Sequence, residues 1–149
     1  MECALCSSIA AGSGISVNSD WILQIPGGRA PLAGWVILTP RRHRRRLDDL
    51  SESEAKTLGT LLTTTSQSVV KFTEATRTYT ANWAENTPHV HFHIVPRLPS
   101  LPPKRLGWDV FQMMSDQSTR PPTAVQEQTL SSIAAHVTAL HKQYEETVR

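Results

Sequence analysis

Five short apolar runs, each bounded by turn-forming residues, predict the strands of this chain. They cover residues 21–25, 35–38, 79–84, 90–95 and 110–114. The first two runs end close to Pro26 and Pro40, because proline lacks the N–H group that a sheet ladder requires. A polar turn at residues 85–88 joins the third run to the fourth.

Two longer segments carry apolar residues at helical spacing. Ser51 and Glu54 form a capping box, which predicts a helix from this point to about Phe72. From Pro122 to about residue 147, apolar residues recur every three or four positions and predict a C-terminal helix. A shorter helix is predicted over residues 3–11. Successive parallel strands are usually connected by a helix, and the predicted strands are too many for these helices to connect in that way. We therefore predict the α+β class with a mainly antiparallel sheet.

The length and composition limit the possible classes of protein. A chain of 149 residues with 39% hydrophobic and 19% charged residues predicts one globular domain over residues 1–149. No run approaches the roughly eighteen apolar residues that cross a bilayer, so no membrane partner is expected. Residues 1–30 show no secretory pattern. We therefore expect a cytoplasmic protein.

One short run concentrates the positive charge of the chain. Five arginines surround a histidine in the run Arg41-Arg42-His43-Arg44-Arg45-Arg46. This run is either a solvated turn or a positive rim that attracts polyphosphates or nucleic acid. It also weakly matches a nuclear-targeting pattern, which makes the nucleus the alternative location. Because Asp48 and Asp49 follow at once, the positive field is confined to one turn, and nucleic acid is not expected as a partner.

The two cysteines of the chain, Cys3 and Cys6, are separated by two residues. A disulfide across so short a loop would contribute little stability. A metal site fits the spacing better, but two thiolates need two further ligands from elsewhere in the chain.

Half of the six histidines lie within residues 89–93, where they alternate with apolar residues. In a strand, His89, His91 and His93 would share one face and the apolar residues the other. One alternative is that the three histidines have no chemical role and are only exposed polar positions on an amphipathic strand. Two chemical alternatives are a catalytic three-histidine metal site and a histidine nucleophile supported by two imidazoles. Three such positions span roughly 13 Å, too far for one ion with bonds of about 2.0–2.1 Å, so the spacing favours the nucleophile.

This segment, residues 89–96, resembles the histidine triad (HIT) family. The resemblance extends upstream to residues 34–43 and 47–51 and to the C-x-x-C pair, so it covers most of residues 3–97. It implies a HIT-like fold, in which one long central helix and a C-terminal helix accompany the antiparallel sheet, usually in a homodimer. A proline-rich loop over residues 98–107 and a helix over about 122–147 would follow the triad core.

The resemblance also implies an activity and the residues that perform it. His91 would attack the α-phosphorus of a nucleotide or nucleotide conjugate, and water would then cleave the nucleotidyl-histidine. His93 would bind the phosphate and stabilise developing charge. Asn82 and Asn86 would contact phosphate, although an asparagine before Thr-Pro is also ordinary turn chemistry. Trp108 either closes the leaving-group side of the site or fills core. Dinucleoside polyphosphates and nucleoside phosphoramidates are the expected substrates.

Zinc-bearing members of the family provide the ligands that the cysteine pair lacks. The resemblance places His43 and His89 beside Cys3 and Cys6 in a closed Cys₂His₂ set for structural Zn²⁺. His43 could instead cap the turn within the basic run. No organic cofactor is expected.

Three departures from the family pattern leave the preferred nucleoside open. Trp35 stands where many members have histidine, and residues 84–88 replace a Gly-Gln loop. Gln24 lies near the place of the acidic residue that usually binds the ribose hydroxyls. A zinc-activated hydrolase and a non-catalytic nucleotide-binding or interaction module remain the alternatives to a covalent mechanism.

Overall fold

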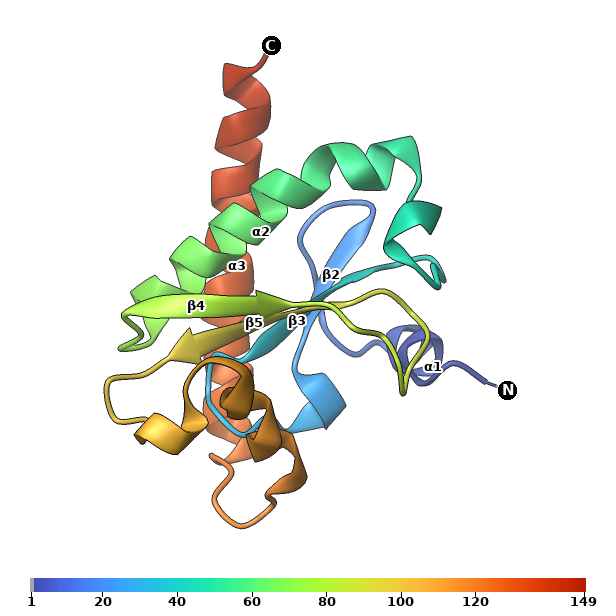
Figure 1. Ribbon diagram of the computed structural model, residues 1–149. Coiled ribbons are helices and arrows are strands. Elements are labelled where there is room, and N and C mark those ends of the chain that lie inside the picture. The colour runs from blue at the N-terminus through green and yellow to red at the C-terminus, as the bar shows by residue number, and fades with distance from the viewer. Residues whose placement is uncertain (1) are drawn as a thin grey trace.

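An antiparallel sheet forms the centre of the computed structural model, which describes residues 2–149 (Figure 1). Its five strands are β1 (Ile15–Ser16), β2 (Trp21–Gln24), β3 (Val36–Pro40), β4 (Arg77–Ala81) and β5 (Phe92–Arg97). They lie in the order β1-β2-β3-β5-β4, and all neighbours are antiparallel. The predicted α+β class is confirmed, although the two-residue strand β1 was missed.

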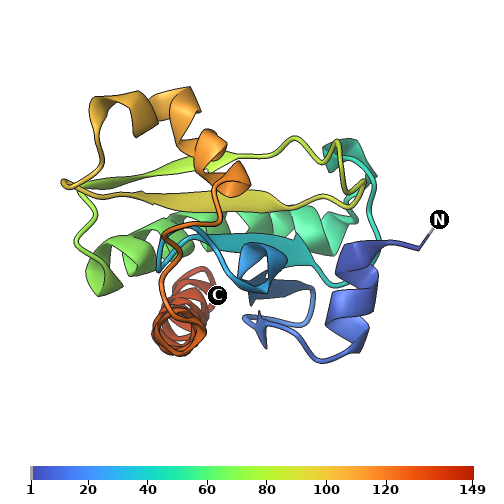
Figure 2. The same cartoon turned by 90° about the horizontal axis from the view of Figure 1, so that it is seen from below.

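Three α-helices accompany the sheet: α1 (Ala4–Ala10), α2 (Glu52–Phe72) and α3 (Thr123–Thr147). The capping box at the start of α2 is present, because the Ser51 hydroxyl accepts from the N–H of Glu54 and the Glu54 carboxylate accepts from the N–H of Ser51. Figure 2 shows α3 and the segment after β5 on opposite sides of the strands. No helix within residues 2–149 has the length and apolar character needed to span a membrane.

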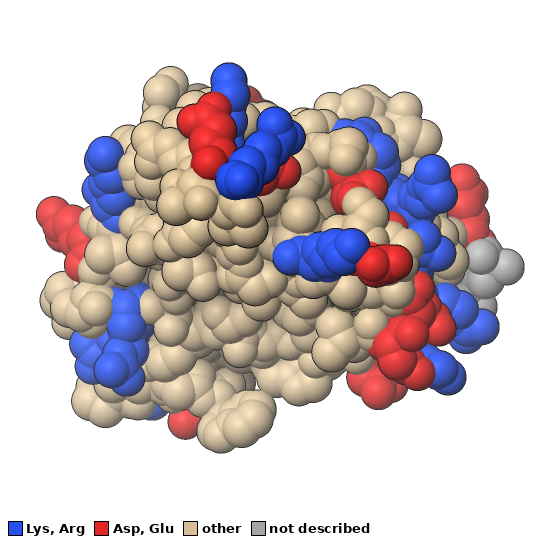
Figure 3. Space-filling model, turned by 90° about the horizontal axis from the view of Figure 1, so that it is seen from above, with Lys and Arg blue, Asp and Glu red and all other residues tan. Residues whose placement is uncertain are grey.

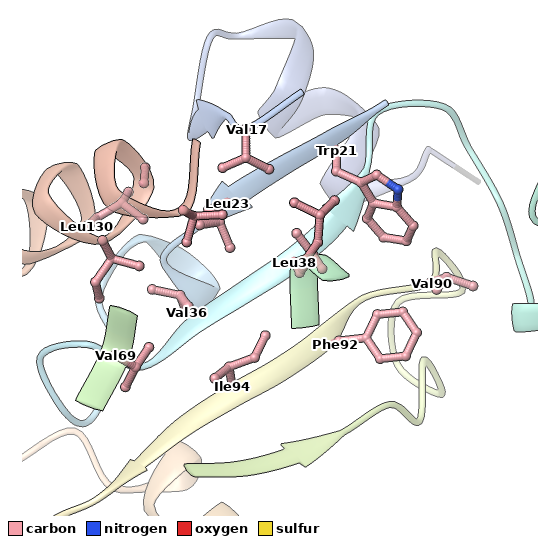
Figure 4. Packing of buried hydrophobic residues seen from close by; sticks show 14 residues of the cluster. Val17, Trp21, Leu23, Val36, Leu38, Val69, Val90, Phe92, Ile94 and Leu130 are labelled. Carbon is pink, nitrogen blue, oxygen red and sulfur yellow. The ribbon is translucent and has the colours of Figure 1, made fainter. Parts of the chain in front are cut away.

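The main core fills the space between the sheet and the two long helices (Figure 4). Alternate strand residues point into it, as the two-residue period of a strand requires. The contributors from the sheet and the triad segment are Trp21, Leu23, Val36, Leu38, Val90, Phe92 and Ile94. Residues Leu61 and Val69 of α2 and Leu130 and Val137 of α3 pack against them.

The strand predicted over residues 110–114 is wrong. This segment belongs to a 3₁₀ helix, Gly107–Ser115, in which Val110 is fully buried. Together with Trp35 and Val95, it forms a second, smaller core on the sheet face opposite α2 and α3. A short apolar run fits either a strand or a buried helical turn, and periodicity alone does not distinguish them.

The strand predicted over residues 90–95 begins later than expected, at Phe92. The N–H of Val90 donates to the carbonyl of Arg44 at 2.7 Å, outside the sheet ladder. His89 and His91 therefore precede the strand, whereas His93 lies within it. The predicted alternation is confirmed nonetheless, because Val90 and Phe92 point into the main core. Similarly, the strand predicted over residues 79–84 is Arg77–Ala81.

Candidate active site and metal centre

His93 lies in β5, on the sheet face that carries the second core. In the ladder, His93 pairs with Ile37 of β3 on one side and with Ala81 of β4 on the other. His91 follows two residues earlier, and the two imidazole rings are 5.1 Å apart. The structure therefore brings the two predicted catalytic histidines together.

The imidazole of His91 is oriented by a backbone group. Its Nδ1 lies 2.7 Å from the carbonyl oxygen of His89. A carbonyl only accepts hydrogen bonds, so Nδ1 of His91 carries a proton, and the neutral form of the ring has its lone pair on Nε2. This is the tautomer that a histidine nucleophile requires.

The imidazole of His93 is almost completely buried and contacts Trp35. The indole N–H of Trp35 donates to Nδ1 of His93 at 3.0 Å. Burial, followed by repulsion from His91, lowers the pKa of His93 to about 4. His93 is therefore neutral at physiological pH.

A cavity of about 280 Å³ opens over both imidazoles. The loop before the triad forms one wall, which includes Glu85 and Asn86, and Gly27 lies on another side. Leu5 of α1 also lines it. His91 and His93 thus share one cavity.

The other predicted binding residues lie outside this cavity. Asn82 lines an adjacent, larger cavity of about 730 Å³, together with Arg45. Trp108 is 82% exposed and lines a third cavity, along β4. Trp108 therefore does not fill core. Gln24 is buried, donates to the Ser8 hydroxyl at 2.9 Å and does not line this cavity.

Sequence reasoning missed Trp83, which lines all three of these cavities. Its ring packs edge-on against Phe111 at 4.4 Å, and Phe111 packs against His93 at 5.4 Å. It is nevertheless 48% exposed. Its position in the sequence could have indicated this, because Trp83 lies between Asn82 and Asn86 in the loop just before the triad.

Four side chains form a candidate metal-binding cluster beside the candidate active site. The ligand atoms of Cys3, Cys6, His43 and His89 all lie within 4.8 Å of one another. Nδ1 of His89 is 3.4 Å from both sulfurs, and Nδ1 of His43 is 3.3 Å from the sulfur of Cys6. A tetrahedral site with bonds of about 2.0–2.3 Å places its ligand atoms roughly 3.5 Å apart, so these residues fit a divalent metal such as zinc.

The hydrogen bond at the far side of His89 supports the same assignment. Nε2 of His89 donates to the carbonyl of Pro40 at 2.9 Å, which leaves Nδ1 unprotonated toward the cysteines. Burial lowers the pKa of this fully buried imidazole. A ligating histidine must be neutral, so the environment of His89 favours metal binding.

Two arginines of the basic run form ion pairs with acidic side chains. Nε of Arg44 lies 2.9 Å from the buried carboxylate of Glu54, and Arg46 pairs with Asp48 at 2.6 Å. Burial alone would raise the pKa of Glu54, but the N–H of Ser51 and the Arg44 guanidinium lower it. Figure 3 shows basic and acidic side chains interleaved on one face of the molecule, with no extended patch of one sign.

Comparison with known proteins agrees with this geometry. A family model described as the HIT domain matches residues 28–100. A search of curated proteins finds no match. Similar solved structures include a Hit-like protein involved in cell-cycle regulation from Bartonella henselae, with 17% identity, a TM-score of 0.65, and coverage of 91% of this chain and 96% of that chain.

Two further solved structures share the fold. A hypothetical histidine triad nucleotide-binding protein from Sulfolobus tokodaii has 16% identity, a TM-score of 0.66 and coverage of 93% of each chain. A Zn-bound histidine triad family protein from Mycobacterium smegmatis has 15% identity, a TM-score of 0.59, and coverage of 99% of this chain and 98% of that chain. The predicted HIT-like fold is thus confirmed, and residues 28–100 of the chain form a HIT domain.

Proposed function

We propose that this protein is a nucleotide hydrolase or nucleotidyl transferase that acts at the α-phosphorus through a covalent intermediate on His91. Membership of the HIT family supports a nucleotide-binding function of the hydrolase or transferase type in general. The observation that carries the finer proposal is the hydrogen bond from His91 to the His89 carbonyl, because it leaves Nε2 of His91 free to attack.

In the first step, the lone pair of Nε2 forms a bond to the α-phosphorus. The bond from phosphorus to the leaving group breaks, and the leaving group departs with the bonding electrons and takes a proton from solvent. The ring of His91 then carries a positive charge, which the carbonyl of His89 stabilises. In the second step, water attacks phosphorus and loses a proton, and the P–N bond returns its electrons to Nε2. An alcohol or amine in place of water would make the reaction a transfer.

The substrates we propose are dinucleoside polyphosphates or nucleoside phosphoramidates. His93 would donate a hydrogen bond to the phosphate, with Asn86 in the same cavity. Asn82 and Trp108 would contact only the parts of a substrate that extend beyond this cavity. Trp83 would contact substrate at the boundary between the cavities.

We propose structural zinc at Cys3, Cys6, His43 and His89. Four protein ligands would close the coordination shell, so the ion would hold α1 against the triad segment without an open position for water. The zinc-activated alternative has less support, because both ring nitrogens of His89 are directed to the cysteines and to Pro40 and not toward the cavity.

We also propose that residues 1–149 form a single domain that dimerises and resides in the cytoplasm. Strand β4 is an edge of the sheet, and edge strands present unpaired N–H and C=O groups that a second copy could bind. Light scattering on the purified protein measures the dimerisation, with a mass near 33 kDa expected for two chains of 16.5 kDa.

The test of function is a screen of nucleotide conjugates with His91→Ala as the inactive variant. We expect turnover of at least one conjugate to fall by at least about 10³-fold, since loss of a covalent nucleophile removes the main path. His136→Ala, which changes a histidine of α3 outside the cavity, is the matched control. Phosphorus-labelled, acid-labile protein should accumulate only with an intact His91. Nucleotide binding without any turnover by the wild type would instead indicate a binding module.

A further inference from the structure

Trp35 and His93 form a polar contact beside the cavity. The indole nitrogen of Trp35 lies 3.0 Å from Nδ1 of His93, and the two rings meet nearly perpendicular with centroids 6.0 Å apart. Trp35 is 1% exposed and packs with Val95 and Val110 in the second core. Its ring therefore has a fixed orientation.

The roles of donor and acceptor in this contact follow from the two rings. An indole nitrogen carries a proton and offers no lone pair, so Trp35 only donates. Nδ1 of His93 must accept, which places the proton of the neutral imidazole on Nε2. An imidazole at position 35 could donate or accept, whereas an indole allows only this one state of His93.

We propose that Trp35 is a positioning residue of the active centre, which holds His93 in the neutral tautomer with its proton on Nε2 as a donor to the phosphate. This inference rests on the proposed function, because the phosphate is the substrate group that the donor would meet. With Nδ1 bound to Trp35, Nε2 is the ring nitrogen of His93 that remains available to the cavity.

The neighbouring His91 has the opposite tautomer. Its Nδ1 donates to the His89 carbonyl and its Nε2 holds a lone pair. The two adjacent imidazoles thus present one nucleophile and one hydrogen-bond donor to the same cavity. His93 can bind a phosphoryl oxygen while His91 attacks the phosphorus, so the donor stabilises charge where it develops.

The surroundings of His93 favour the neutral form of its ring. Phe111, which packs against the ring of His93, carries no charge. The other ionisable groups that line the cavity are His91 and Glu85. The pKa of His93, about 4, agrees with a ring that stays neutral while it accepts from Trp35.

The tautomer can be measured in the resting protein with [¹⁵N]histidine and long-range ¹H–¹⁵N correlation spectra. In the wild type we expect His93 to show an unprotonated Nδ1 and a protonated Nε2 throughout the neutral pH range. Trp35→Phe removes the donor and should yield averaged shifts from both tautomers. In the same variant, kcat should fall about 10- to 100-fold with KM nearly unchanged, since complete loss of a transition-state donor lowers kcat about 10²- to 10³-fold.

Trp21→Phe is the matched control for lost packing. Trp21 is also fully buried, and its indole donates to the carbonyl of Glu54 at 3.2 Å in the main core, away from His93. This variant should lose stability while the tautomer of His93 stays as in the wild type.

Two results would overturn the inference. One is a protonated Nδ1 on His93 in the wild type, and the other is a Trp35→Phe variant with wild-type tautomer and kcat. Failure of the proposed function is distinguishable from both. If the wild type turned over no nucleotide conjugate, that function would be lost, while the spectrum of the resting protein would still decide whether Trp35 fixes the tautomer.

Discussion

The backbone carbonyl of His89 accepts a hydrogen bond from Nδ1 of His91 at 2.7 Å, while the side chain of His89 lies 3.4 Å from the sulfurs of Cys3 and Cys6. One residue thus contributes both to the metal-binding cluster and to the orientation of the proposed nucleophile. A change at the cluster is expected to reach the active site through the position of this backbone carbonyl.

Zinc content and thermal stability test the cluster. The purified protein should contain about one zinc per chain, and Cys3→Ser should lose it. We expect Tm to fall by about 5–10 °C, because each kcal/mol lost lowers Tm by roughly 2–4 °C in a domain of this size. Ser7→Ala, in the same helix, should keep both zinc and Tm. The structural zinc would be disproved if wild-type protein, purified without chelator, contained no metal and had the same Tm as the Cys3→Ser variant.

Arg44 and Arg45 should differ in their contributions despite their adjacency. Arg44→Ala leaves the carboxylate of Glu54, which is 1% exposed, without its cation, so stability should fall by about 1–3 kcal/mol. Arg45→Ala should leave stability unchanged. It should raise KM for a polyphosphate about two- to fivefold at low salt and not at high salt, since Arg45 lines the larger cavity and exposed charges are screened. Urea denaturation and initial rates measure the two effects. An equal loss of stability in both variants would contradict the assignment.

The depressed pKa of His93 predicts a dependence of stability on pH. The folded value of about 4 lies below the ordinary value of 6.5. Between these values the unfolded chain binds more protons, so stability is full above pH 6.5 and falls as the pH drops toward 4. The loss should reach about 2 kcal/mol at pH 5. Because metal ligands also titrate, the measure is the difference between the wild type and His93→Gln in urea denaturation at pH 7 and pH 5. Equal losses in the two proteins would show that His93 is not responsible.

Trp83 is expected to contribute more to substrate binding than Trp108. Trp83 lines the cavity over the triad and is packed against Phe111, whereas Trp108 is 82% exposed. Trp83→Ala should raise KM about fivefold or more, since stacking of a base on an aromatic ring contributes about 1–3 kcal/mol. Trp108→Ala should change KM less than about twofold. The opposite ranking of the two variants would place the main contact with the leaving group at Trp108.

The sequence predicted the parts of the site whose chemistry is visible in residue spacing. Cys3-x-x-Cys6 lacks two ligands, and the resemblance to the family supplied His43 and His89, which the structure brings to the cysteines. The alternation around His91 predicted which neighbours enter the main core, because that period follows from strand geometry.

The remaining features depend on tertiary contacts that local patterns do not encode. The ion pair of Arg44 with Glu54 joins the basic turn to the start of α2, and no spacing rule predicts it within a run of arginines. The contact of Trp35 with His93 joins residues 58 positions apart. The 3₁₀ helix Gly107–Ser115 has the composition of a short strand, and only its packing on the sheet face opposite α2 and α3 distinguishes it.

The short helix α1 has a consequence for local dynamics. It has seven residues and no buried side chain, and isolated helices of fewer than about 12 residues are marginal in water. Its attachment depends on Cys6, on the capping residue Cys3 and on the contact of Ser8 with Gln24. In metal-depleted protein, the amides of α1 should exchange with deuterium long before those of β3 and β5. Because Leu5 lines the cavity over the triad, the same opening would widen the entrance to the active site.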